Sequence, residues 1–140
     1  MVKPIDFIAE FACIHEGSAD YLKELARAVQ AAGATGVKFQ VFSAEEIVSS
    51  DHPDYDYLTR IAFSQNEWVN HIKVVNSLGL DVWVDISGPF SLQVVEASFD
   101  NISGIKIHSA DIDNGIVLGG ARRLGLPIAI GCGGTPLIDL

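Results

Sequence analysis

Short apolar runs alternate along this chain with longer stretches in which apolar positions recur every three or four residues. The short runs predict five β-strands, at residues 7–12, 37–42, 80–86, 104–107 and 127–130. The stretches between them predict four helices, at residues 18–33, 64–79, 90–99 and 114–125. Such alternation is typical of an α/β fold with parallel strands and right-handed crossovers.

Capping signals mark where the helices begin and end. Ser18 precedes the first helix, and Ser64 with Glu67 three residues later forms a capping box for the second. Asn114 or Asp113 can cap the fourth helix. Glycines follow three of the helices, at Gly33, Gly79 and Gly125. The first strand is expected to be buried.

Two parallel architectures fit this order, five units of an eight-fold (β/α) barrel or an open doubly wound sheet. The second would carry a G-x-G-x-x-G turn after the first strand, but the turn here reads CIHEGSAD. We therefore favour an incomplete TIM-type barrel of about five strands, with residues 1–140 as one N-terminal portion. A full barrel takes ~250 residues, so this length does not close one.

The segment at residues 43–63 is expected to be a long polar connection with a functional role. Uncovered strand edges predict self-association into a homo-oligomer. A formal charge of −9 disfavours nucleic-acid and anionic-membrane partners. With no secretory leader or membrane-length apolar stretch, we expect a cytoplasmic protein.

Polar side chains recur at the ends of the apolar runs, which is the active-site edge of a parallel barrel. Glu10 interrupts an apolar strand, so its carboxylate must be paired, either for function or as a structural partner of Lys38 or Lys106. Lys38 and Gln40 alternate and therefore face the same side. A lysine there can bind phosphate or carboxylate, or form a Schiff base if its pKa is lowered.

The fourth strand ends in a second polar group. Lys106 and His108 share a face, and Ser109 and Asp111 follow them. A cation, a group that titrates near neutrality and a carboxylate can together transfer protons. The turns at Ser87 and at residues 131–134 are rich in small residues whose backbone N–H groups can approach a phosphate.

Histidine and cysteine spacing gives no recognisable metal site. His15 follows the first strand, where it could contact a substrate or metal, and His71 is expected on a helix surface. Cys13 and Cys132 show no redox-type spacing, and Cys132 is expected to be a buried, inert thiol.

These residues resemble the N-terminal half of the sialic acid synthase (nonulosonate synthase) family. The resemblance spans residues 7–134 and rests on four blocks of sequence, FIAEFACIHEGSADYLKELARAVQAAGATGVKFQVFSAEEIVS, DISGPF, GIKIHSADIDN and LPIAIGCGG. It implies a transferase that condenses phosphoenolpyruvate with an N-acylated amino sugar. Carbon 3 of phosphoenolpyruvate attacks the sugar aldehyde, water adds at carbon 2, and phosphate leaves by C–O cleavage.

By the matching motifs, Lys38 would hold phosphoenolpyruvate and Gln40 would face the sugar. Glu10 and Asp111 would handle protons as catalytic residues, and Ser109 would contact phosphoenolpyruvate. The resemblance adds Ser87 and His15 as substrate-binding residues. It also implies a divalent metal, Mn²⁺ or Mg²⁺, whose ligands come from later strands that this chain lacks, as it lacks the family's antifreeze-like domain.

The chain departs from the family at several turns. Gly88 replaces the threonine of an S-T-P-F turn, Asp111 replaces a glutamate, and Ala110 replaces a glycine. The family's S-T-G turn is GCG here, at residues 131–133, so several phosphate donors are lost. Two alternatives to the synthase therefore stay open, a non-catalytic half-barrel that binds or regulates, and a Schiff-base aldolase that uses Lys38 or Lys106.

Overall fold

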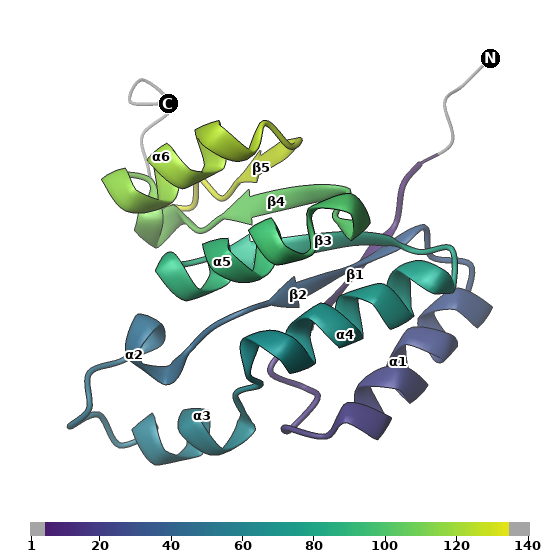
Figure 1. Cartoon of the computed structure of the whole chain (residues 1–140), viewed down its shortest axis with the longest axis horizontal. Coiled ribbons are helices and arrows are strands. Elements are labelled where there is room, and N and C mark those ends of the chain that lie inside the picture. The colour runs from purple at the N-terminus through teal and green to yellow at the C-terminus, as the bar shows by residue number, and fades with distance from the viewer. Residues whose placement is uncertain (1–4, 135–140) are drawn as a thin grey trace.

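A computed structural model of the chain describes residues 5–134 (Figure 1). Five strands alternate with six helices and two 3₁₀ turns in the described part of the chain. The strands are β1 (Ile8–Ala12), β2 (Gly36–Gln40), β3 (Asp81–Ile86), β4 (Gly104–Ile107) and β5 (Ile128–Ile130). The helical elements are α1 (Ala19–Ala31), α2 (Ala44–Ile47), α3 (Tyr55–Ile61), α4 (Gln65–Ser77), α5 (Pro89–Ala97), η1 (Phe99–Asn101), η2 (Ser109–Asp111) and α6 (Gly115–Leu124).

The strands form one parallel sheet in the order β1-β2-β3-β4-β5. Each crossover therefore places the next strand beside the last in the same direction, as in a barrel wall. In a doubly wound sheet the order of the strands reverses at a switch point, and this sheet has no such reversal in residues 5–134, so the doubly wound alternative is wrong. The predicted incomplete barrel of parallel βα units is confirmed, and the sheet stays open because β1 and β5 do not pair within residues 5–134.

Four helices cover one face of this sheet. α1, α4, α5 and α6 pack against one another in chain order (Figure 1). Alternate strand residues such as Val37, Phe39, Val82, Val84 and Ile105 are fully buried in the core cluster with residues of these helices. The strand residues between them consequently project from the opposite face, which is the lumen side of a barrel wall.

The predicted helix signals are confirmed at most ends. Ser18 and Asn114 accept backbone hydrogen bonds in the first turns of α1 and α6, and Ser64 and Glu67 form the capping box of α4. Gly125 follows α6 with φ 66°, a left-handed conformation that suits glycine. None of the helices between residues 5 and 134 is long and apolar enough to span a membrane.

Four sequence predictions are wrong. The segment at residues 43–63 contains the short helices α2 and α3. His71 is 5% exposed because it shares the inner face of α4 with Trp68 and Ile72. Cys132 is exposed because it follows the exposed edge strand β5. β1 is only partly buried, since it has a neighbour on one side only, and Phe11 alone among its residues is fully buried.

Candidate active site

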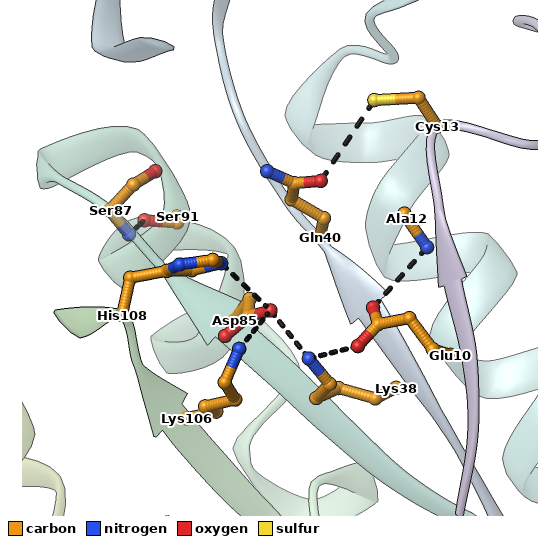
Figure 2. Close-up of polar contacts among 10 residues, drawn as sticks. All are labelled: Glu10, Ala12, Cys13, Lys38, Gln40, Asp85, Ser87, Ser91, Lys106 and His108. Atoms are coloured by element: carbon orange, nitrogen blue, oxygen red, sulfur yellow. Dashed lines mark hydrogen bonds and ion pairs between the residues drawn. The ribbon is translucent and has the colours of Figure 1, made fainter. Parts of the chain in front are cut away.

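A row of oppositely charged side chains crosses the lumen face of the sheet. It contains Glu10 from β1, Lys38 from β2, Asp85 from β3 and Lys106 from β4 (Figure 2). Because the strands are adjacent and parallel, residues of like position on neighbouring strands come together. Asp85 pairs in register with Gln40 on one side and with Lys106 on the other.

Asp85 is the centre of this row. Its Oδ2 atom accepts hydrogen bonds from Lys38 Nζ at 2.6 Å and Lys106 Nζ at 3.2 Å. The Nε2 atom of His108 lies 3.5 Å from the same oxygen. The side chain of Asp85 is only 4% exposed, so the two lysines compensate a buried negative charge.

Lys38 lies between two carboxylates, because it also forms an ion pair with Glu10. Burial alone would lower the pKa of Lys38, but hydrogen bonds with Asp85 and Glu10 raise it above the ordinary value. The amine is therefore held protonated, which suits the binding of an anion better than nucleophilic attack. Of the two structural partners predicted for Glu10, the structure places Lys38 against it.

A pocket of about 240 Å³ adjoins this row at the carboxyl ends of β2, β3 and β4. Its polar lining residues are Gln40, Glu46, Asp85, Ser87, His108 and Asp111. The Oε1 atom of Gln40 accepts a weak hydrogen bond from Cys13 Sγ at 3.9 Å. Asp111 accepts from Asn114 Nδ2 at 3.0 Å through its Oδ1 atom.

The structure brings most of the predicted site residues to this edge. Gln40, Ser87 and Asp111 line the pocket, and Glu10 and Lys38 belong to the adjoining charged row. Ser109 begins η2 at the same end of β4 but does not line the pocket.

His15 lies elsewhere, between β1 and α1, where it is buried among aromatic side chains of the core. It is 0% exposed and stacks on Phe63 with ring centroids 4.7 Å apart, and it meets Trp68 edge-on at 5.6 Å. Its Nδ1 atom accepts from the backbone N–H of Gly17 at 3.1 Å. Burial and the nearby His71 lower the pKa of His15 to about 4, against a smaller opposing effect of Glu16. It is therefore neutral at physiological pH.

Two acidic residues of the site escaped the sequence reasoning. Asp85 interrupts an apolar strand in the same way as Glu10, and that pattern could have identified it. Glu46 lies on α2, inside the segment expected to be an irregular loop, and its Oε1 atom accepts from the backbone N–H of Phe90 at 2.5 Å. No sequence signal links a residue of α2 to the start of α5.

A divalent metal was expected from the resemblance. No group of three or more His, Cys, Asp or Glu side chains in residues 5–134 is arranged to hold a metal ion. The carboxylate nearest the centre, Asp85, is already bonded to two lysines. The described residues therefore offer no metal site, and the ligands that the resemblance places on later strands stay a prediction.

Comparison with known proteins agrees with the fold. The sequence pattern of the NeuB family matches residues 25–139 of this chain. The chain belongs to the NeuB family. Its resemblance to the sialic acid synthases, drawn from the residues alone, is thus confirmed at the level of the family.

Three solved structures share the fold. The chain matches the N-acetylneuraminic acid (sialic acid) synthetase of Leptospira borgpetersenii, solved with citrate, with a TM-score of 0.84, 20% identity and 98% of this chain covered. It matches a putative spore coat polysaccharide biosynthesis protein E of Chromobacterium violaceum with a TM-score of 0.82 and 19% identity, covering 95% of this chain. It matches spore coat polysaccharide biosynthesis protein spsE of Bacillus subtilis with a TM-score of 0.76 and 22% identity, covering 97% of this chain.

A curated relative, an uncharacterized protein of Methanocaldococcus jannaschii, is 26% identical over 132 residues, or 94% of this chain. The chain spans 38% of that relative's length. It spans 47%, 42% and 38% of the three solved chains, in the order given above. The matched region therefore corresponds to less than half of each of these proteins.

Proposed function

We propose that this chain acts in carbohydrate biosynthesis as part of a sialic acid synthase-like enzyme, which condenses phosphoenolpyruvate with an N-acylated amino sugar. The observation that carries the proposal is the paired lysines, Lys38 and Lys106, at the strand edge of a NeuB-family fold. The two amines, on β2 and β4 at either side of β3, suit the carboxylate and phosphate of phosphoenolpyruvate.

In this proposal the other polar residues orient the substrates and move protons. Gln40 and Ser87, in the pocket, form hydrogen bonds with the sugar, and Ser109 contacts phosphoenolpyruvate. Glu10 and Asp111 handle protons while carbon 3 of phosphoenolpyruvate bonds to the aldehyde carbon. Water then adds at carbon 2, and phosphate leaves with its C–O bond electrons.

The test is phosphate release from phosphoenolpyruvate with an N-acylated amino sugar and Mn²⁺ present. We expect release that requires both substrates, and a loss of at least 100-fold in Lys38→Met because the paired amine is removed. Lys73→Met, which removes an exposed lysine of α4, is the matched control. Release that is unchanged in Lys38→Met would contradict the role of Lys38.

One observation favours a second candidate, a half-barrel that binds a ligand without turnover. Asp85 already compensates both lysines, so a bound anion must compete with it. This candidate predicts saturable binding of phosphoenolpyruvate with no phosphate release at any enzyme concentration. The raised pKa of Lys38 disfavours a Schiff base on this residue, and borohydride trapping of a keto acid adduct would test one on Lys38 or Lys106.

A further inference from the structure

α5 begins two residues after Ser87, which lines the pocket, and the N–H groups at its start form hydrogen bonds with other residues of the chain. A helix N-terminus attracts anions because its first N–H groups lack helical partners and carry the positive end of the helix dipole. Here Glu46 Oε1 takes the N–H of Phe90 at 2.5 Å. The N–H groups of Ser87 and Gly88 bond to Ser91 Oγ at 3.0 and 3.1 Å. Donors that a phosphate would use therefore already have partners.

Gly88 makes room for the Glu46 carboxylate. A Cβ atom built at residue 88 would lie 2.6 Å from Glu46 Oε1 and 2.8 Å from its Cδ. The backbone of Gly88 is extended, with φ −178°, so its conformation does not itself require glycine. Gly88 instead leaves free the space that the Glu46 carboxylate occupies. A threonine, as in the S-T-P-F turn that this segment resembles, would displace the carboxylate.

A second observation shows what kind of group the pocket lacks. Asp85 is 3% exposed and lines the same pocket, and its Oδ1 atom has no hydrogen-bond partner among residues 5–134. Glu46 Oε2 is likewise buried with no partner in that range. Asp111 adds a third carboxylate, and the described lining includes no lysine or arginine. Buried acceptors of this kind need donors from a ligand.

We propose that Glu46 is an internal anion that occupies the start of α5, so that this pocket rejects phosphate and takes the hydroxyl or amino groups of a ligand. Glu46, with Gly88 as its steric partner, is then a specificity-determining residue. The phosphate of a substrate is left to Lys38 and Lys106, on the far side of Asp85, and the donor-bearing substrate to the pocket. That assignment of substrates rests on the proposed function, whereas the exclusion of phosphate does not.

The test is a titration of the ¹⁵N-labelled chain with inorganic phosphate at constant ionic strength, read at the backbone amide of Phe90. We expect no saturable shift of this amide in the unmodified chain. Glu46→Ala frees the amide and removes a repelling charge. We therefore expect a saturable shift in this variant, and phosphate binding at least tenfold tighter than any binding by the unmodified chain. Glu45→Ala removes the same charge from the neighbouring exposed residue, whose carboxylate bonds to Tyr55 outside the pocket, and should behave as the unmodified chain.

Gly88→Ala is the second variant. The added Cβ meets the end of a flexible side chain, so it should displace the Glu46 carboxylate without unfolding the protein, and phosphate should again shift Phe90. Phosphate that binds at Phe90 equally well in the unmodified chain would overturn the proposal, as would no gain in either variant. Failure of the proposed function would appear separately, as absent phosphate release with the Phe90 response intact.

Discussion

At the scale of single residues, Asp85 organises the site. One buried oxygen of its carboxylate meets two lysine amines and lies near a histidine. Its charge holds Lys38 and Lys106 together at the strand edge, where each would otherwise repel the other. The same contact compensates both amines, so an anionic ligand must compete with Asp85 for them.

Asp85→Asn should destabilise the fold. It removes the charge that compensates two partly buried lysines, although Glu10 still pairs with Lys38. We expect a loss of roughly 2–4 kcal/mol in the free energy of unfolding, measured by urea denaturation. Asp81→Asn is the control, since Asp81 lies on the same strand and bonds to Ser103 at an exposed position. Equal losses in the two variants would contradict the role of Asp85.

The buried His15 should make stability depend on pH. The pKa of His15 in the folded protein is about 4, below the ordinary 6.5, so the unfolded chain binds more protons as pH falls. Stability is therefore lost between pH 6.5 and about 4, by up to about 3 kcal/mol from this residue.

Denaturation of the unmodified protein and His15→Phe across this pH range measures the effect. The variant loses the hydrogen bond from Gly17 at every pH, but its stability should fall less steeply with acidity. Parallel curves for the two proteins would show that His15 does not carry the dependence.

Individual site residues were predictable where they interrupt an apolar run. Glu10, Lys38 and Gln40 were singled out by that rule, and Asp85 obeys it but was overlooked.

The prediction for His71 was wrong although its spacing from Trp68 and Ile72 already placed it on the inner face of α4. The contact of Glu46 with α5 joins residues 44 positions apart, and local pattern carries no information about such contacts.

At the scale of elements, length decided which helices could be predicted from the sequence, because α5 was predicted although it has no side-chain cap bond. α1, α4 and α6 have side-chain caps, and all three were predicted. α2 and α3 have none and are short, so they were mistaken for a loop. They form because their apolar residues Ala44, Leu58 and Ile61 pack with Phe42 in a second buried cluster.

Ser64→Ala should destabilise α4 measurably. Its hydroxyl accepts from the N–H of Glu67, and the Glu67 carboxylate accepts from the Ser64 N–H in return. Removing the hydroxyl should cost about 1 kcal/mol in the free energy of unfolding. Ser43→Ala, at the start of α2 where no side-chain cap bond is made, should cost less than half of that. The idea fails if the two costs are equal.

At the scale of the whole molecule, the sheet exposes two edges. β1 and β5 each pair on one side only, and large apolar side chains flank them, with Phe7 65% and Ile130 52% exposed. The parallel strands were predictable from the alternation of strands and helices, and the barrel order from the missing G-x-G-x-x-G turn, whereas the register was not predicted. What covers the edges was not, because edge residues read as ordinary strand residues in the sequence.

These edges should drive self-association. Light scattering is expected to give a mass above that of one chain, and Ile128→Lys on β5 should shift the protein toward the monomer. Ile116→Lys, at a comparably exposed apolar position on α6, is the control and should leave the mass unchanged. A monodisperse monomer of the unmodified chain would contradict this expectation.

In the proposed function, Lys38 and Lys106 bind the anionic groups of phosphoenolpyruvate. A calorimetric titration of phosphoenolpyruvate into the chain and its Lys38→Met and Lys73→Met variants, with and without Mn²⁺, tests this binding. We expect saturable binding that Lys38→Met weakens at least tenfold and Lys73→Met leaves unchanged. Binding that is equal in all three proteins, or absent from the unmodified chain, would contradict this role of the lysines.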